Sequence, residues 1–344
     1  MTDANRLALF RRLARAGALL AFIVIVMGAW VRLTAAGLGC PDWPGCYGHF
    51  HPAAAVVEAD SINALHPTHP FDYGKALREM VHRYAASTLG LLILALAGLA
   101  VANRRFAQQP RLLPGLLVLT VCLQGLLGAL TVTKLVMPPI VTLHLVGGLT
   151  TLSLLWWLSL TPATRSVSAA ERRARAVAVG ALVLLAGQIL LGGWTSTNYA
   201  ATACPDFPTC QGRLVPDGDW SAGFTVWRGL GQDYEGGVLP PAARAAIHAT
   251  HRFGAVLVGL ALLGCAAVAF RASSQRDTRR AALLLVAAVA AQWLIGINLI
   301  WKGFPLSLGT AHNAGAALLL CAMLLLLRCL TPRPPSLGLT GRRA

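Results

Sequence analysis

The sequence predicts an all-α membrane protein with eight transmembrane helices in two pseudo-symmetric four-helix bundles, and with both termini in the cytoplasm. Three observations support this fold: the composition, eight long apolar runs, and motifs that return in the second half. Hydrophobic residues make up 56% of the chain and charged residues 12%, and the mean hydropathy is +0.62. Soluble proteins carry about 25% charged residues.

The eight apolar runs are each long enough to span a bilayer, which takes about 20 residues. Helices satisfy their own backbone hydrogen bonds in the bilayer core, and the alternating polarity of a membrane β-barrel strand is absent. The runs lie near 16–36, 77–101, 112–133, 139–160, 175–197, 243–270, 281–301 and 305–330.

The positive charges are distributed unevenly between the connections, and this distribution indicates the orientation of the chain in the membrane. Nineteen of the 29 Lys and Arg residues lie in the two terminal segments and the second, fourth and sixth connections between runs: Arg6, Arg11, Arg12, Arg15, Arg104, Arg105, Arg111, Arg165, Arg172, Arg173, Arg175, Arg271, Arg276, Arg279, Arg280, Arg328, Arg333, Arg342 and Arg343. By the positive-inside rule these segments are cytoplasmic. The net charge of +16 therefore predicts orientation and no nucleic-acid partner. A basic surface for other anionic partners is the alternative.

The first apolar run is span-length, and no small-residue cleavage site follows it, so we expect it to remain as a span. A mitochondrial presequence would be longer and richer in Ser and Arg. We therefore expect a multi-pass protein of the bacterial plasma membrane.

The motifs repeat at a nearly constant offset. It is 164 residues for Trp30/Trp194, Cys40/Cys204 and Cys46/Cys210, 169 for His82/His251 and 168 for His144/His312. Four spans are an even number, so the two halves would share one orientation, as in parallel repeats. We predict halves at 1–165 and 166–344, with outer loops at 37–76 and 198–242.

Each outer loop carries a cysteine pair, Cys40 with Cys46 and Cys204 with Cys210. The predicted side is oxidising, and a turn with two prolines separates each pair, so we predict two disulfides. Free thiols, or one site with four sulfur ligands, are the alternatives. The remaining cysteines lie in or beside spans as small apolar residues: Cys122, Cys265, Cys321 and Cys329.

Four histidines occupy matching positions, roughly 5–10 residues into an even-numbered span or about 8–15 Å deep: His82, His144, His251 and His312. Two histidines at one depth on two helices suit axial ligation of haem in a four-helix bundle. Arg83 and Arg252 are candidate contacts for haem propionates. Polar residues that face the bundle interior, or a proton relay, are alternatives, whereas zinc would need three or four convergent ligands.

The two halves differ at one position. Glu79 precedes His82 by three residues, and His248 stands at the same spacing before His251. A carboxylate beside a macrocycle can act as a base or stabilise a developing cation; alternatively, Glu79 only pairs with an adjacent arginine. We predict that the first half performs chemistry and the second holds a permanent haem.

Four further histidines lie in the first outer loop: His49, His51, His66 and His69. We expect solvated side chains there; a loose metal site is the alternative.

The chain resembles the haem A synthase family over about residues 16–330. The resemblance rests on Cys-Pro-Asp-Trp-Pro-Gly-Cys at 40–46, on Glu79-x-x-His82-Arg83, and on His144, His251-Arg252 and His312. It implies an oxidoreductase that converts a ring methyl of haem O to a formyl group by successive hydroxylations, giving haem A for terminal oxidases.

The resemblance also implies roles for residues. His82 and His144 would hold the substrate haem, with Glu79 as the catalytic carboxylate. His251 and His312 would ligate a haem b cofactor. Cys40 and Cys46 would form the family's outer-loop disulfide, and Cys204 and Cys210 would form the same element in the second half.

An iron with two axial imidazoles has no open position for oxygen. Either one histidine leaves during turnover, or electrons are withdrawn and water is the nucleophile, which would suit Glu79. The sequence leaves both routes open.

Three other functions compete with this interpretation. A quinol-linked carrier would hold two permanent haems b, a haem transporter would bind haem weakly in both halves, and a thiol–disulfide oxidoreductase would depend on the loop cysteines. Expected partners are haem O, the lipid bilayer, haem O synthase and cytochrome oxidase assembly factors; a homo-oligomer is compatible with the sequence.

Overall fold

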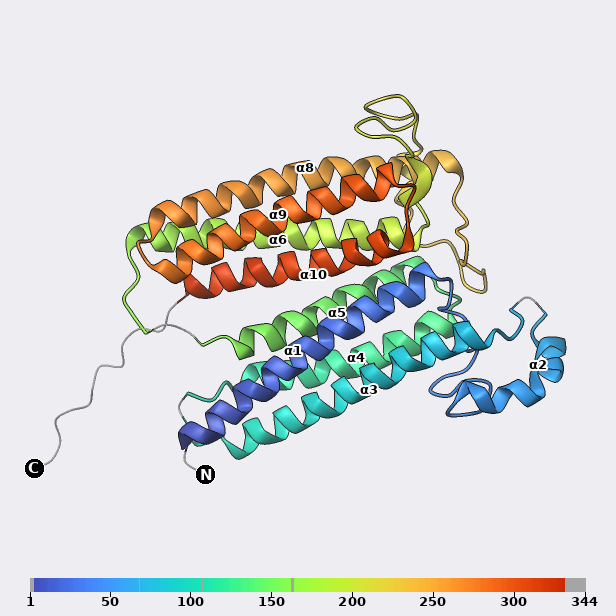
Figure 1. The fold of residues 1–344 in the computed structure, drawn as a ribbon, viewed down its shortest axis with the longest axis horizontal. Helices are drawn as coiled ribbons and strands as arrows, with labels where there is room; N and C mark the ends of the chain where they lie inside the picture. Colours follow the sequence, from blue (N-terminus) through green and yellow to red (C-terminus); the bar gives the residue numbers. More distant parts are fainter. Residues whose placement is uncertain (1–2, 68, 107, 162–163, 332–344) are drawn as a thin grey trace, which may run out of the picture.

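The computed structural model describes residues 3–67, 69–106, 108–161 and 164–331, which are mostly helical (Figure 1). Arg333, Arg342 and Arg343, part of the predicted basic C-terminus, lie outside these residues. Within the described chain, eight helices are long and apolar enough to cross a membrane. They are α1 (Asp3–Leu33), α3 (Tyr73–Ala102), α4 (Leu112–Thr133), α5 (Pro138–Ser159), α6 (Ala169–Thr197), α8 (Pro241–Ala272), α9 (Arg276–Trp301) and α10 (Leu306–Cys329).

Short helices occupy the two outer loops. The first loop contains η1 (Pro52–Glu58) and α2 (Ala59–Leu65), and the second contains η2 (Ala201–Ala203) and α7 (Trp220–Gly223). The described residues form isolated bridges but no strand. The prediction of an all-helical protein with eight membrane-length helices is confirmed.

Two helices begin well before the apolar runs that predicted them. Helix α1 begins at Asp3, and α6 begins at Ala169. A capping box starts α6: Ser168 Oγ accepts from the Glu171 amide at 3.1 Å, and Glu171 Oε2 accepts from the Ser168 amide at 3.0 Å. Arginine is a good helix former, so the charged turns continue the helix beyond the apolar segment.

The eight long helices pack as two groups of four. Helices α1, α3, α4 and α5 contact one another, as do α6, α8, α9 and α10 (Figure 1). The groups meet where α10 packs on α1 and α5, and where α5 packs on α6. Buried side chains from both groups form one continuous apolar core, so the groups are parts of one packed structure.

Polar contacts join the two groups near both ends of the helices. Trp156 Nε1 donates to the carbonyl of Cys321 at 3.0 Å. The Arg32 guanidinium donates to the carbonyl of Ser196 at 2.6 Å and lies 3.9 Å from the centroid of the Tyr199 ring. These contacts fix the relative position of the groups.

The tight turns that follow α4 and α9 have the same backbone conformation. Leu135 and Val136 follow α4, each with φ of 50°, and Gly303 and Phe304 follow α9 with φ of 70° and 61°. Only glycine adopts this left-handed region readily. The turns place α5 and α10 close beside the helices that precede them.

Candidate functional site

The four predicted haem histidines lie on four helices, two in each group: His82 on α3, His144 on α5, His251 on α8 and His312 on α10. Each imidazole packs against a glycine on the long helix that precedes its own. A Cβ atom built on Gly28, Gly128, Gly192 or Gly296 would lie 3.0, 3.6, 3.1 or 3.1 Å from the Cε1 atom of His82, His144, His251 or His312, respectively. The glycines therefore leave the space that the rings occupy.

In the second group the two imidazoles converge. The ring centroids of His251 and His312 lie 6.4 Å apart, with the ring planes at 81°. Metal–nitrogen bonds of about 2 Å would fit a single metal ion between two rings at this separation. The donor set thus suits a metal held from two sides.

In the first group the histidines have unsatisfied ring atoms. Nδ1 of His82 and Nδ1 of His144 are buried without a hydrogen-bond partner. A buried polar atom without a partner costs about 1–3 kcal/mol. Such atoms fit a site that is completed by a bound group.

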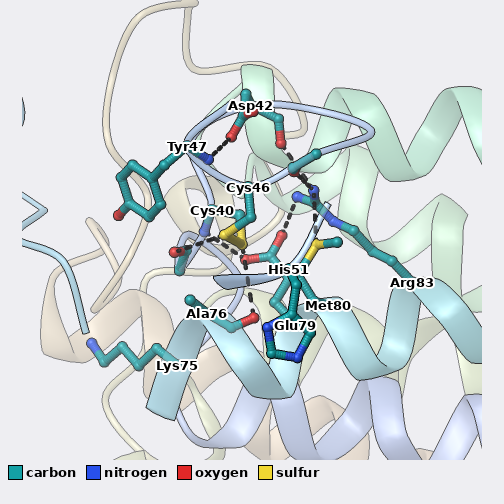
Figure 2. The surroundings of a disulfide bond; sticks show 12 residues. Cys40, Asp42, Cys46, Tyr47, His51, Lys75, Ala76, Glu79, Met80 and Arg83 are labelled. Carbon is teal, nitrogen blue, oxygen red and sulfur yellow. Dashed lines mark hydrogen bonds and ion pairs between the residues drawn. A yellow bond between two sulfur atoms is a disulfide. The ribbon is translucent and has the colours of Figure 1, made fainter. Parts of the chain in front are cut away.

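Glu79 lies one turn before His82 and is 4% exposed. Its Oε1 accepts from Arg83 at 2.5 Å, and its Oε2 accepts from the backbone amide of Cys40 at 2.9 Å. Figure 2 shows the carboxylate between the helix and the cysteine loop. The predicted alternative pairing with arginine does occur, and the carboxylate also binds the loop.

Arg83 fastens the same loop to α3. Its guanidinium donates to the carbonyls of Asp42 at 2.9 Å and Gly45 at 2.5 Å, in addition to Glu79 (Figure 2). Because an arginine has five N–H donors in a fixed fork, one side chain can hold several carbonyls at once.

Arg252 does the same in the second group. It donates to the carbonyls of Cys204, Asp206 and Thr209, each at 2.7 Å, and its Nε donates to His248 Nε2 at 3.2 Å. His248 thus stands in the place of Glu79. The two arginines face the cysteine loops, and their contact with propionates stays a prediction.

Each cysteine pair is disulfide-bonded, Cys40 to Cys46 and Cys204 to Cys210. Asp42 accepts from the amides of Tyr47 and Gly48. In the second loop, Asp206 accepts from the amides of Gln211 and Gly212. The loops are therefore built alike. The other four cysteines do not pair.

The loop histidines are dispersed. His49 lies 3.5 Å from Glu58, His51 Nδ1 accepts from the Ala53 amide, and His66 packs edge-on against Tyr47. His69 lies 2.9 Å from Asp233 and so joins the first outer loop to the second. In the described part of the chain, no three His, Cys, Asp or Glu side chains are placed to hold a metal ion.

One feature of the site was not recognised in the sequence. Gln188 Nε2 lies 3.0 Å from His251 Nδ1 and donates to the His251 carbonyl at 2.9 Å. Gln292 Nε2 donates to the His312 carbonyl at 3.0 Å and lies 3.4 and 3.5 Å from the two ring nitrogens. The available signal was a glutamine four residues before a glycine, at 188/192 and 292/296.

The sequence of this chain is similar to the sequences of one family of known proteins. The family described as "Cytochrome oxidase assembly protein" (COX15-CtaA) matches residues 11–324. A protein named Heme A synthase from Shewanella oneidensis is 40% identical over 304 residues, which cover 88% of this chain and 90% of the relative. Proteins of the same name from Methylobacterium sp. and Rhizorhabdus wittichii are 30% and 27% identical; the matches cover 92% and 89% of this chain and 90% of each relative. This chain belongs to the COX15-CtaA family of cytochrome oxidase assembly proteins.

Proposed function

We propose that this protein is a haem A synthase, an oxidoreductase that converts a ring methyl group of haem O to a formyl group. Family membership and the relatives named Heme A synthase support this activity. Two successive hydroxylations would give a hydrated aldehyde, which loses water to form haem A for terminal oxidases. A multi-pass membrane protein suits a substrate with a farnesyl tail.

The histidine pairs provide two haem sites. We infer that His82 and His144 hold the substrate haem, because they lie on two helices, α3 and α5, of the half that contains the buried Glu79. We infer that His251 and His312 hold haem b, because their rings converge with room for one metal ion. When bound, haem b supplies one-electron redox chemistry.

We assign the chemistry to the first half because of Glu79. It is the buried carboxylate beside a histidine pair, and its counterpart in the second half is His248. Arg83 and the Cys40 amide hold the Glu79 carboxyl group in place. The carboxylate then stabilises positive charge that develops on the substrate carbon, or orients a water molecule toward it.

We further infer that the halves, 1–165 and 166–344, are parallel repeats. The bridge between Cys46 and His49 returns as that between Cys210 and Arg213, at the offset of 164 residues. By the positive-inside rule the termini are cytoplasmic, and the cysteine loops face the outside of a bacterial plasma membrane. Because haem O is insoluble in water, we infer that haem O synthase transfers it directly to this protein.

The test is the identity of the haems in the purified protein, made in cells that also make haem O. The proposal expects haem A, or its hydroxylated precursor, together with haem b. Haem b alone, at two per chain, would reject the proposal and favour a di-haem electron carrier. Weakly held, unmodified haem O in both halves would favour a transporter.

A further inference from the structure

Three of the four histidine sites have a glutamine on the preceding helix, four residues before the glycine that faces the imidazole. These pairs are Gln124/Gly128, Gln188/Gly192 and Gln292/Gly296. At the fourth site, Val24 stands four residues before Gly28. The offset of 164 residues that relates Gly28 to Gly192 also relates Val24 to Gln188, so His82 has a valine where His251 has a glutamine.

Both glutamines of the second half bind their histidines at two points. Gln188 Nε2 lies 2.9 Å from the His251 carbonyl oxygen and 3.0 Å from Nδ1 of the ring. Gln292 Nε2 lies 3.0 Å from the His312 carbonyl oxygen, and 3.4 and 3.5 Å from the two ring nitrogens Nδ1 and Nε2. Each amide therefore holds the helix backbone at its histidine and lies beside the ring, and the Gln188 amide directly contacts Nδ1.

A second glycine makes room for each amide. Gly254 follows His251 by three residues, and a Cβ atom there would lie 2.2 Å from Gln188 Oε1. Gly315 follows His312 by three residues, and a Cβ atom there would lie 2.1 Å from Gln292 Oε1. No side chain fits at that distance, so the glutamine and the glycine form one unit.

The first half lacks this hold at His82. At His144 it keeps the same two residues: Gln124 lies over Gly147, which follows His144 by three residues, although its Nε2 and not its Oε1 faces the glycine. Position 24, which corresponds to Gln188, carries no side-chain amide for His82, and Nδ1 of this ring is buried without a partner. Three residues after His82, where the second half has Gly254, stands Ala85, so a Cβ would meet a glutamine placed as Gln188 is.

A partner on the second ring nitrogen matters for a metal-binding histidine. It fixes the tautomer and the ring orientation, and removing such a partner typically lowers metal affinity about 10- to 100-fold. A glutamine amide can serve either tautomer, because its nitrogen donates and its oxygen accepts after a half-turn. Histidines with this partner should keep a bound haem longer than histidines without it.

We propose that Gln188 and Gln292 are positioning residues that retain haem in the second half, and that their absence at His82 makes the first half an exchangeable site. This inference rests on the proposed function, in which substrate haem must enter and product haem must leave the first half at each turnover. Of the four histidines, His82 is then the ligand that exchanges most readily.

The first experiment removes the glutamine beside His251. The variant Gln188→Val gives position 188 the valine that stands at the equivalent position 24. The matched control is Gln124→Val, because Gln124 occupies the equivalent position in the first half, whereas haem b is held in the second. Haem b in the purified full-length proteins is measured per chain, and its transfer to excess apomyoglobin is followed by absorbance. The electron paramagnetic resonance spectrum of the ferric haem reports the geometry of its axial ligands independently of activity.

We expect Gln188→Val to accelerate the loss of haem b about 10- to 100-fold and to shift its resonance spectrum, whereas Gln124→Val leaves both unchanged. Equal rates and spectra in Gln188→Val and the unmodified protein would overturn the proposal. If the unmodified protein held no haem b, the proposed function itself would fail, which is a distinguishable result.

The complementary experiment adds a glutamine beside His82. It remains informative if Gln188→Val does not fold. The double variant Val24→Gln/Ala85→Gly supplies both the amide and the space above it, and Val24→Gln alone is the control in which Ala85 still blocks the amide. We expect slower release of haem from the first half only in the double variant. Unchanged release in a folded, haem-loaded double variant would contradict the proposal.

Discussion

The backbone amide of Cys40 donates to Oε2 of Glu79 at 2.9 Å, so the disulfide loop directly positions the buried carboxylate. Arg83 completes the arrangement, because it binds Glu79 and three carbonyls of the same loop. The loop is therefore part of the proposed catalytic site.

Opening the first disulfide should impair the chemistry more than the binding of haem b. In a Cys40→Ser/Cys46→Ser variant the loop is free to move, and Glu79 loses a hydrogen bond of a type that contributes about 1.5–3 kcal/mol. We expect conversion of haem O to fall at least about tenfold with haem b content unchanged. The matched control is Cys204→Ser/Cys210→Ser, in which conversion per bound haem b should be unaffected. Equal conversion of haem O in both variants would show that the first loop has no specific role in catalysis.

Glu79 should be required for conversion and not for loading. Glu79→Gln retains the size of the side chain and removes its charge, so we expect conversion to fall roughly 10²- to 10⁴-fold while haem O remains bound. Haem content and haem identity are measured in the same extract. If Glu79→Gln converted haem O at the normal rate with normal loading, the carboxylate would be a structural partner of Arg83 alone.

The glycines that face the histidines should differ in their tolerance of a methyl group. A Cβ at Gly28 would lie 3.0 Å from the His82 ring, whereas a Cβ at Gly128 would lie 3.6 Å from the His144 ring. Overpacking of this kind costs about 1–3 kcal/mol, so Gly28→Ala should lower substrate haem content and Gly128→Ala should leave it nearly unchanged. Similar haem contents in the two variants would show that the close approach does not position His82.

The second cysteine loop should keep its structure in moderately acidic solution. The Thr209 hydroxyl and the Gly212 amide donate to Asp206 and lower the pKa of its carboxyl from 3.8 to about 2. The stabilisation is therefore complete above about pH 4 and is lost as the pH falls through about 2. Hydrogen exchange at the Gln211 and Gly212 amides, corrected for intrinsic rates, should show protection at pH 4 that Asp206→Ala lacks. Equal protection in the variant would exclude the carboxylate as the organiser of this loop.

The sequence was sufficient to predict the eight membrane-length helices, because each apolar run coincides with one long helix. It did not predict where these helices begin. Helix α6 starts at Ala169, inside an arginine-rich segment, because the capping box of Ser168 and Glu171 is a local signal that hydropathy does not measure. The short helices of the outer loops depend on tertiary contacts and were also not predicted.

Of the candidate site, the sequence indicated Glu79, its counterpart His248 and the four histidines that we propose hold haem. It could not show that Arg83 and Arg252 would bind the cysteine loops, because those carbonyls come near α3 and α8 only after folding. The contacts of Gln188 and Gln292 were not predicted, because the spacing of each glutamine to a glycine identifies a histidine partner only once the fold shows which glycine faces which histidine.

The most direct test of the account is the haem content of purified protein from cells that make haem O, compared between the unmodified chain and Glu79→Gln. The account predicts haem A, or its hydroxylated precursor, with haem b in the unmodified chain, and haem O with haem b in the variant. Haem b alone in both proteins, at two per chain, would contradict it.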